Sequence, residues 1–137
     1  MRQGEWLLTY HVNHIRQLEV IQTRCMQCRD FLYNPDEEQM LMKLESNARI
    51  IQDYINVFDL VVSALSDDDK WFVETHFVKR TSITAMCEMD FPNGRILSKT
   101  TIHNIKNRII AEVSELCVLL NFYPLDFLPD SQQLMEA

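Results

Sequence analysis

Apolar residues in the first half of the chain recur at alternating spacings of three and four, which predicts two long helices. The first helix spans residues 6–32 and the second runs to about residue 65. Between them, Asn34 has the side chain of an N-cap and Pro35 suits a first helical position. So short a turn predicts an antiparallel hairpin of about 40 Å. The first seam is Leu7, His11, His14, Leu18, Ile21, Cys25, Cys28 and Leu32; the second is Leu41, Leu44, Ala48, Ile51, Ile55, Phe58, Val62 and Leu65.

Two features of this hairpin leave open what its outer surfaces contact. His11 and His14 predict a wetter N-terminal end than a leucine seam would give. Tyr54, Val57 and Val61 lie beside the second seam. Plain core packing is the simpler interpretation of the hairpin, and self-association through this second stripe is the alternative.

Serines and threonines mark the helix starts in the second half of the chain. Ser66 precedes three aspartates, and Thr81 or Ser82 precedes a short helix. Asn93-Gly94 predicts a turn, with a tiny hairpin between residues 89 and 97. Ser98 then begins a long helix. Its buried stripe is predicted to be Ile102, Ile105, Ile109, Val113, Leu116 and Leu120.

The predicted fold is therefore all-α, with three parts. Residues 1–65 form the long helical hairpin, residues 66–121 form a helix-turn-helix-like unit, and residues 122–137 form a tail. Prolines exclude one continuous helix in the tail. Its aromatic residues are expected to fold back over the core, or alternatively to form an exposed hook for another chain.

Composition agrees with a compact helical protein. Apolar residues make up 47% of the chain, and only two glycines are available for tight turns. No apolar run approaches the length of a membrane span, and the N-terminus lacks the apolar core of a signal peptide. We therefore expect a cytoplasmic protein with reduced, packed cysteines and no membrane association.

Charge is distributed unevenly along the acidic chain. The formal net charge is −7, yet residues 79–110 contain six basic and two acidic residues. This segment therefore carries +4, and the rest of the chain carries −11. A basic segment on an acidic protein is more informative than the total, because it localises an attraction for anions.

The exposed face of the helix that begins at Ser98 carries the side chains that contact DNA. Lysine and arginine neutralise phosphate or bind guanine, asparagine pairs with adenine, and threonine reaches backbone oxygens. A short helix and a turn precede it, as in a helix-turn-helix. The alternative is a merely solvated polar face. The candidate DNA-binding residues are Lys79, Arg80, Arg95, Lys99, Thr100, Thr101, His103, Asn104, Lys106, Asn107 and Arg108.

A family resemblance covers about residues 60–120. The pattern Leu65-Ser66-x-x-Asp69-x-x-Phe72, followed by Ser98-x-x-Thr101-Ile102-x-x-Ile105-Lys106-x-Arg108-Ile109, resembles region 4 of sigma-70-type factors. It is closer to phage late-gene transcription regulators of the ArpU/RinA type. The resemblance implies that the helix matching residues 98–110 enters the major groove. The connection from Asp90 to Leu97 is longer than a usual helix-turn-helix turn.

Metal and enzyme signatures are weak. His11-x-x-His14 and Cys25-x-x-Cys28 have ligand-like spacings, but 11 residues of straight helix, about 16 Å, separate the two pairs. One zinc ion requires all its ligands at about 2 Å. The chain also lacks a glycine-rich phosphate loop and a nucleophile elbow. We therefore expect no metal, no cofactor and no enzymatic activity.

The sequence favours a DNA-binding transcriptional regulator, and the family resemblance implies a phage or prophage origin. Phosphates would be bound by Lys79, Arg80, Arg95 and Lys99, and bases by the face around residues 101–108. The expected partners are double-stranded DNA, RNA polymerase and a second copy bound through the hairpin. One alternative is a small-terminase-like DNA-packaging subunit, and another is an acidic protein-interaction module that ignores DNA.

Overall fold

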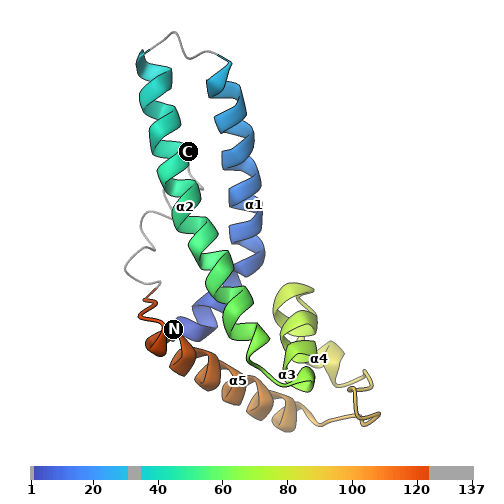
Figure 1. The fold of residues 1–137 in the computed structure, drawn as a ribbon. Helices are drawn as coiled ribbons and strands as arrows, with labels where there is room; N and C mark the ends of the chain where they lie inside the picture. The colour runs from blue at the N-terminus through green and yellow to red at the C-terminus, as the bar shows by residue number, and fades with distance from the viewer. Residues whose placement is uncertain (1, 31–34, 124–137) are drawn as a thin grey trace.

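The computed structural model describes residues 2–30 and 35–123, and all regular structure within them is helical (Figure 1). This confirms the all-α prediction for the described part of the chain. None of the described helices is long and apolar enough to cross a membrane. The elements are α1 (Gln3–Arg29), α2 (Pro35–Ser63), α3 (Asp67–Phe72), the π-helix η1 (Val73–Val78), α4 (Ile83–Met86) and α5 (Lys99–Leu119).

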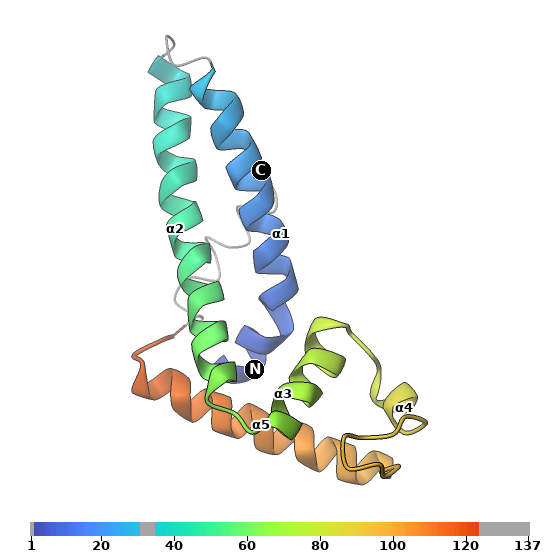
Figure 2. The same ribbon diagram turned by 45° about the vertical axis from the view of Figure 1, so that its right-hand side comes forward.

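The helices α1 and α2 lie side by side and antiparallel, as Figures 1 and 2 show. Their contact uses the predicted seams. In the upper half, Ile21, Cys25 and Cys28 of α1 pack with Leu41 and Ile51 of α2 in a small separate core. Leu32 and Asn34 lie outside the described residues. Among the residues that the structure describes, this upper core is therefore built from the two helices alone.

The predicted wet end of this hairpin is wrong. His11 and His14 are both buried, and the ring of His11 stacks on Phe58 with centroids 3.4 Å apart. Burial lowers the pKa of His14 to about 4, with a smaller contribution from His11. Burial also lowers the pKa of His11, against the opposing charges of Asp59 and Glu74. Both rings are therefore neutral members of the core at neutral pH.

The second stripe of α2 is not available for self-association, which corrects that alternative. Tyr54 and Val61 are buried within the chain, and Val57 packs against the same core. The ring of Tyr54 meets Trp6 of α1 edge-on at 5.4 Å and Phe122 at 5.5 Å. Through Tyr54, the stripe instead packs against Phe122, which follows α5.

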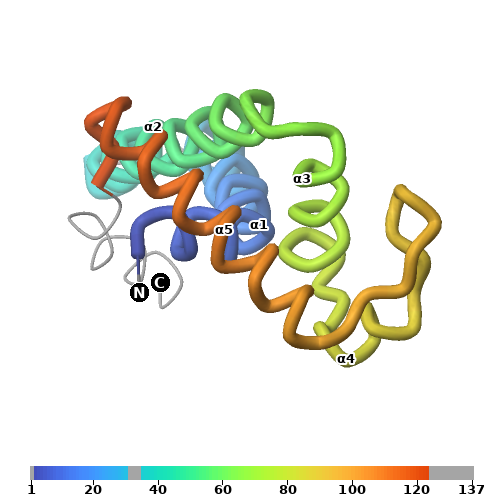
Figure 3. The backbone as a smooth tube through the Cα atoms, turned by 90° about the horizontal axis from the view of Figure 1, so that it is seen from below, coloured from blue at the N-terminus to red at the C-terminus, as the bar shows by residue number. Residues whose placement is uncertain are grey.

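The helix α5 crosses beneath the open end of the hairpin (Figures 1 and 3). It contacts α1 at Gly4, whose N–H donates to Ser114 Oγ at 3.0 Å. A Cβ atom on Gly4 would lie 2.5 Å from Ser114 Oγ and 2.8 Å from the carbonyl oxygen of Ile110. The two helices therefore cross this closely because glycine has no side chain.

The serine caps are confirmed at three helix starts. Ser66, Ser82 and Ser98 each accept a hydrogen bond from the backbone N–H three residues later. The turn at Asn93-Gly94 is also present, with φ of 78° at Gly94. It does not join two strands: residues 87–98, all described, contain no strand, and the Phe91 N–H donates to the Arg95 carbonyl at 3.0 Å.

One large core joins the hairpin to the C-terminal unit. Trp6 and Phe58 of the hairpin belong to the same buried cluster as Phe72, Ile102 and Ile109. The predicted stripe of α5 is largely correct, but Leu120 is 43% exposed. Of the predicted tail, Phe122 is buried and Tyr123 is 43% exposed, and residues 124–137 lie outside the described residues.

Candidate nucleic-acid interface

The first three turns of α5 present three different surfaces around the helix. Successive residues are about 100° apart, so positions three or four apart share a surface. We call Lys99, His103 and Lys106 the basic flank, which faces η1. Thr101, Ile105 and Arg108 form the α3 flank. Thr100, Asn104 and Asn107 form the outer stripe, on the side of the helix opposite the buried residues Ile102 and Ile109.

The outer stripe is polar and uncharged. Thr100, Asn104 and Asn107 are all exposed. Ser98 holds the start of the helix, because its Oγ accepts the Thr101 N–H at 3.2 Å. The stripe therefore begins at a fixed helix end, and it offers amides and a hydroxyl to whatever lies against it.

The basic flank is partly tied to η1. Lys106 is half-buried, with its Nζ 5.8 Å from the centre of the Phe77 ring, a cation–π distance. Burial lowers the pKa of His76, and the nearby Lys106 and His103 lower it further, while its bond to the Thr81 carbonyl opposes them. Lys99 and His103 are exposed. Lys99, His103 and Lys106 therefore share one side of α5.

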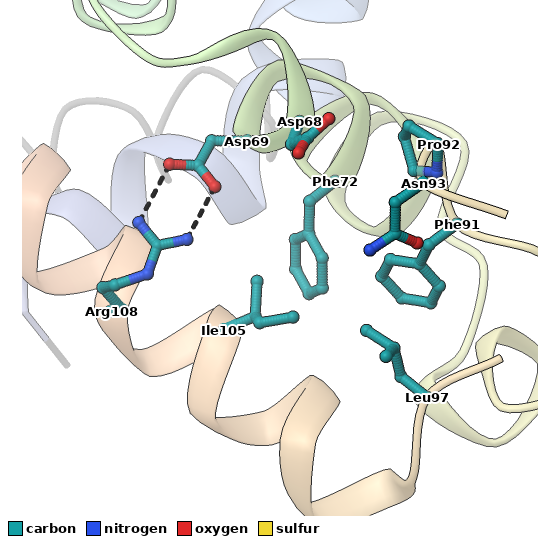
Figure 4. Close-up of a pocket in the computed structure, with 9 residues that line it drawn as sticks. All are labelled: Asp68, Asp69, Phe72, Phe91, Pro92, Asn93, Leu97, Ile105 and Arg108. Carbon is teal, nitrogen blue, oxygen red and sulfur yellow. Dashed lines mark hydrogen bonds and ion pairs between the residues drawn. The ribbon is translucent and has the colours of Figure 1, made fainter. Parts of the chain in front are cut away.

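The α3 flank contains an ion pair that the sequence did not reveal (Figure 4). The guanidinium of Arg108 donates from Nη2 to Asp69 Oδ1 at 2.7 Å and from Nη1 to Asp69 Oδ2 at 2.9 Å. The Asp69 side chain is 7% exposed and that of Arg108 56%. Hydrogen bonds from Arg108 are the main cause of the lowered pKa of Asp69. Arg108 therefore holds α5 against α3.

The remaining predicted residues lie on separate loops. Arg80 donates to Asn13 Oδ1 of α1 at 3.1 Å, so its guanidinium is directed at the hairpin. Lys79 follows η1 and is exposed. Arg95 is exposed in the turn before α5. The fold thus brings together Lys99, His103 and Lys106, whereas Arg80 and Arg108 are bound by other parts of the chain.

Asp69 is the partner of Arg108 that sequence reasoning missed. Its place three residues after Ser66 indicates a capping acid, and its hydrogen bond with Ser66 contributes to the lowered pKa. Capping therefore accounts for an aspartate at this position, and the sequence gives no reason to expect a second partner for it. Its second role is the ion pair with Arg108, which lies 39 positions later in the chain. Helical periodicity does not relate residues at that separation.

The cysteine and histidine pairs of α1 point into the hairpin. Cys25 and Cys28 are buried in the upper core as free thiols, and burial is the main cause of their raised pKa values. Residues 2–30 and 35–123 contain no cluster of three or more metal-ligating side chains. The spacing of these pairs is therefore explained by their seam positions.

Comparison with known proteins adds no relative. No protein-family model matches the chain, and no curated protein or solved structure matches it. The resemblance to sigma-70 region 4 and to ArpU/RinA-type regulators stays an expectation from sequence, and the surface of α5 has to be interpreted from its own chemistry.

Proposed function

We propose that the protein binds double-stranded DNA and reads its sequence through the outer stripe of α5, acting as a transcriptional regulator. The observation that supports this most is the side-chain distribution on that helix. Its uncharged hydrogen-bonding groups face outward, and on the adjacent basic flank Lys99 is exposed and Lys106 is half-buried. This is the arrangement expected when base contacts specify a sequence and phosphate contacts fix the docking.

The base contacts fall on Asn104 and Asn107. An asparagine amide accepts from N6 and donates to N7 of adenine, so adenine is its preferred base in the major groove. Asn107 lies three residues after Asn104, a rise of about 4.5 Å along the helix. This rise is comparable with the spacing of about 3.4 Å between stacked base pairs in DNA, so the two amides would contact neighbouring base pairs. Thr100, one turn earlier, contacts a thymine methyl group or a phosphate. The expected half-site therefore contains neighbouring A·T pairs.

Arg108 is not assigned to base reading in this proposal. A guanine contact requires both arms of a guanidinium fork, and Asp69 already occupies them. Lys106 lies over the Phe77 ring. The proposed phosphate contacts are therefore Lys99, His103 and Lys106 on the basic flank of α5, together with Lys79 after η1 and Arg95 in the turn before α5.

Dimerisation through the hairpin is part of the proposal, on a surface other than the second stripe of α2. Tyr54 and Val61 are inside the chain. Exposed apolar residues on both helices of the hairpin are the available alternatives, namely Ile15, Val20 and Met26 on α1 and Met40, Met42 and Leu60 on α2. A dimer would place two copies of α5 on two half-sites, one helical turn or a multiple of it apart.

Charge-removing variants test the proposed surface. We compare Lys79→Gln with Lys99→Gln against the matched control Lys43→Gln with Arg49→Gln, whose exposed residues lie on α2. Both doubles remove two charges. The first should weaken DNA binding and reduce the slope of log affinity against log salt by about 1 for each phosphate that the variant no longer neutralises. Equal weakening in the two doubles would show that only net charge matters and would refute this surface.

A further inference from the structure

We propose that a cavity on the α3 flank binds one large apolar side chain of a partner protein, with a lysine or arginine beside it. This inference does not depend on DNA binding. The cavity lies between α3, the turn at residues 91–97 and α5 (Figure 4).

The walls of the cavity are mainly apolar. Phe72 comes from α3, Phe91 and Leu97 from the turn, and Ile105 from α5, and all four side chains point toward the same space (Figure 4). The cavity volume is about 140 Å³. An apolar cavity of about 150 Å³ holds one benzene molecule. The site therefore has the size for a single leucine, methionine or phenylalanine side chain.

The wall supplied by the turn is held in place before any ligand binds. Phe91 and Arg95 are joined by a backbone hydrogen bond of 3.0 Å, and the Gly94 N–H donates to the Phe91 carbonyl at 2.7 Å. The Arg95 N–H also donates to Asn93 Oδ1 at 3.0 Å. The Phe91 ring also packs on Trp71, with centroids 4.9 Å apart. Such preorganisation lowers the entropy lost on binding.

The rim of the cavity decides the class of partner. Arg108 is paired with Asp69 and, at 3.4 Å, with Glu112, so the exposed carboxylate of Asp68 is the remaining charge among the residues that line the cavity. Asp67 is exposed on the adjacent residue. These aspartates repel phosphate and attract a cation. The occupant is therefore a basic segment of a protein that presents an apolar anchor.

The cavity and the proposed DNA surface use different sides of α5. Ile105 and Arg108 face α3, whereas Asn104 and Asn107 belong to the outer stripe. A partner seated in the cavity would leave the outer stripe uncovered. The same helix is therefore able to contact DNA and a second protein at once.

Selection of short random peptides displayed on phage against the immobilised full chain tests the inference. Enriched peptides should share a leucine, methionine or phenylalanine next to a lysine or arginine. Their affinity should fall about tenfold or more for Leu97→Phe, which fills the cavity, since burying one such side chain contributes at least that much. Asp68→Asn should weaken them by about two- to fivefold, as for an exposed ion pair.

Matched controls separate the cavity from general surface effects. Leu119→Phe makes the same substitution on the exposed end of α5, and Asp53→Asn removes an exposed carboxylate from α2. Both should leave peptide affinity unchanged. Asp68→Asn alters only a surface side chain, so it reports on the site even if Leu97→Phe disturbs folding. Enrichment of no shared pattern, or affinities that neither cavity variant changes, would overturn the inference.

Discussion

Arg108 shows how the role of one residue depends on what lies opposite it. In the sequence it is one of several cations on a polar helix face. In the structure its two guanidinium arms fit the two oxygens of Asp69, a planar match that lysine does not offer. The burial of the two partners is unequal, because the Asp69 side chain is 7% exposed and Arg108 is 56% exposed. Removing either partner should therefore have different consequences.

Arg108→Gln should destabilise the protein more than Asp69→Asn. The first change leaves a buried carboxylate without its charge partner, and we expect it to lower the free energy of unfolding by about 1–3 kcal/mol. The second leaves a largely exposed guanidinium that is still 3.4 Å from Glu112 Oε2, and Ser66 still caps α3. Urea unfolding of both variants measures the difference. Equal destabilisation, or a larger effect for Asp69→Asn, would contradict the structural role assigned to this pair.

A buried histidine should make stability depend on pH. The pKa of His14 is about 4 in the folded protein, against an ordinary value of 6.5. Between these values the unfolded chain binds more protons, so stability should fall as pH decreases from about 6.5, and the contribution of this group should be fully lost near pH 4. The loss from His14 is about 3 kcal/mol at 1.36 kcal/mol per pKa unit.

His14→Phe should flatten this pH profile, because the phenylalanine ring has no group that titrates. Chemical unfolding at a series of pH values between about 4 and 7 provides the comparison. The flattening will be partial, because His11 and His76 also have lowered pKa values. These two histidines therefore also make the protein less stable as pH falls. A wild-type profile that is flat over this range would contradict the neutral, buried state of His14.

At the scale of elements, periodicity and capping predicted most of the fold. The seams of α1 and α2, the serine caps and the buried stripe of α5 all depend on residues within a few turns of one another, so sequence spacing reveals them. Tyr54 and Val61 were placed on a free surface because α5 and Phe122, which cover that side of the core, belong to another part of the chain. Long-range contacts of this kind leave no periodic signal.

The candidate site was predicted less completely, for the same reason. The exposed positions of α5 follow from its own periodicity. Arg108 contacts Asp69 of α3, and Lys106 contacts Phe77 of η1. Neither contact could be predicted without knowing where α3 and η1 lie relative to α5. The apolar cavity beside them combines three elements, and its walls are far apart along the chain.

The contact of α1 with α5 should tolerate no side chain at Gly4. Helix propensity alone favours alanine over glycine by up to about 1 kcal/mol. At this position, however, a Cβ would overlap Ser114 and the Ile110 carbonyl, so the helices would have to separate. We expect Gly4→Ala to lower the free energy of unfolding by about 1–3 kcal/mol. Thermal or urea unfolding gives the sign directly, and a stabilised variant would contradict the close crossing.

At the scale of the whole molecule, the shared core fixes the DNA-binding candidate to the hairpin. Ile102, Ile109 and Val113 of α5 are buried in the same cluster as Trp6 and Leu7 of α1. The outer stripe therefore has a fixed orientation relative to any dimer formed through the hairpin. The uneven charge has a spatial counterpart as well, with lysines on one flank of α5 and the aspartates of α3 on the other.

The most direct test of this account is the affinity of the purified wild-type protein for random-sequence DNA across a salt series, followed by selection of bound sequences at the higher salt. We predict affinity that falls steeply with salt, and enrichment of a motif containing neighbouring A·T pairs whose preference disappears in Asn104→Ala with Asn107→Ala. Absence of binding even at low salt would show that the outer stripe is merely solvated and would contradict the proposed function.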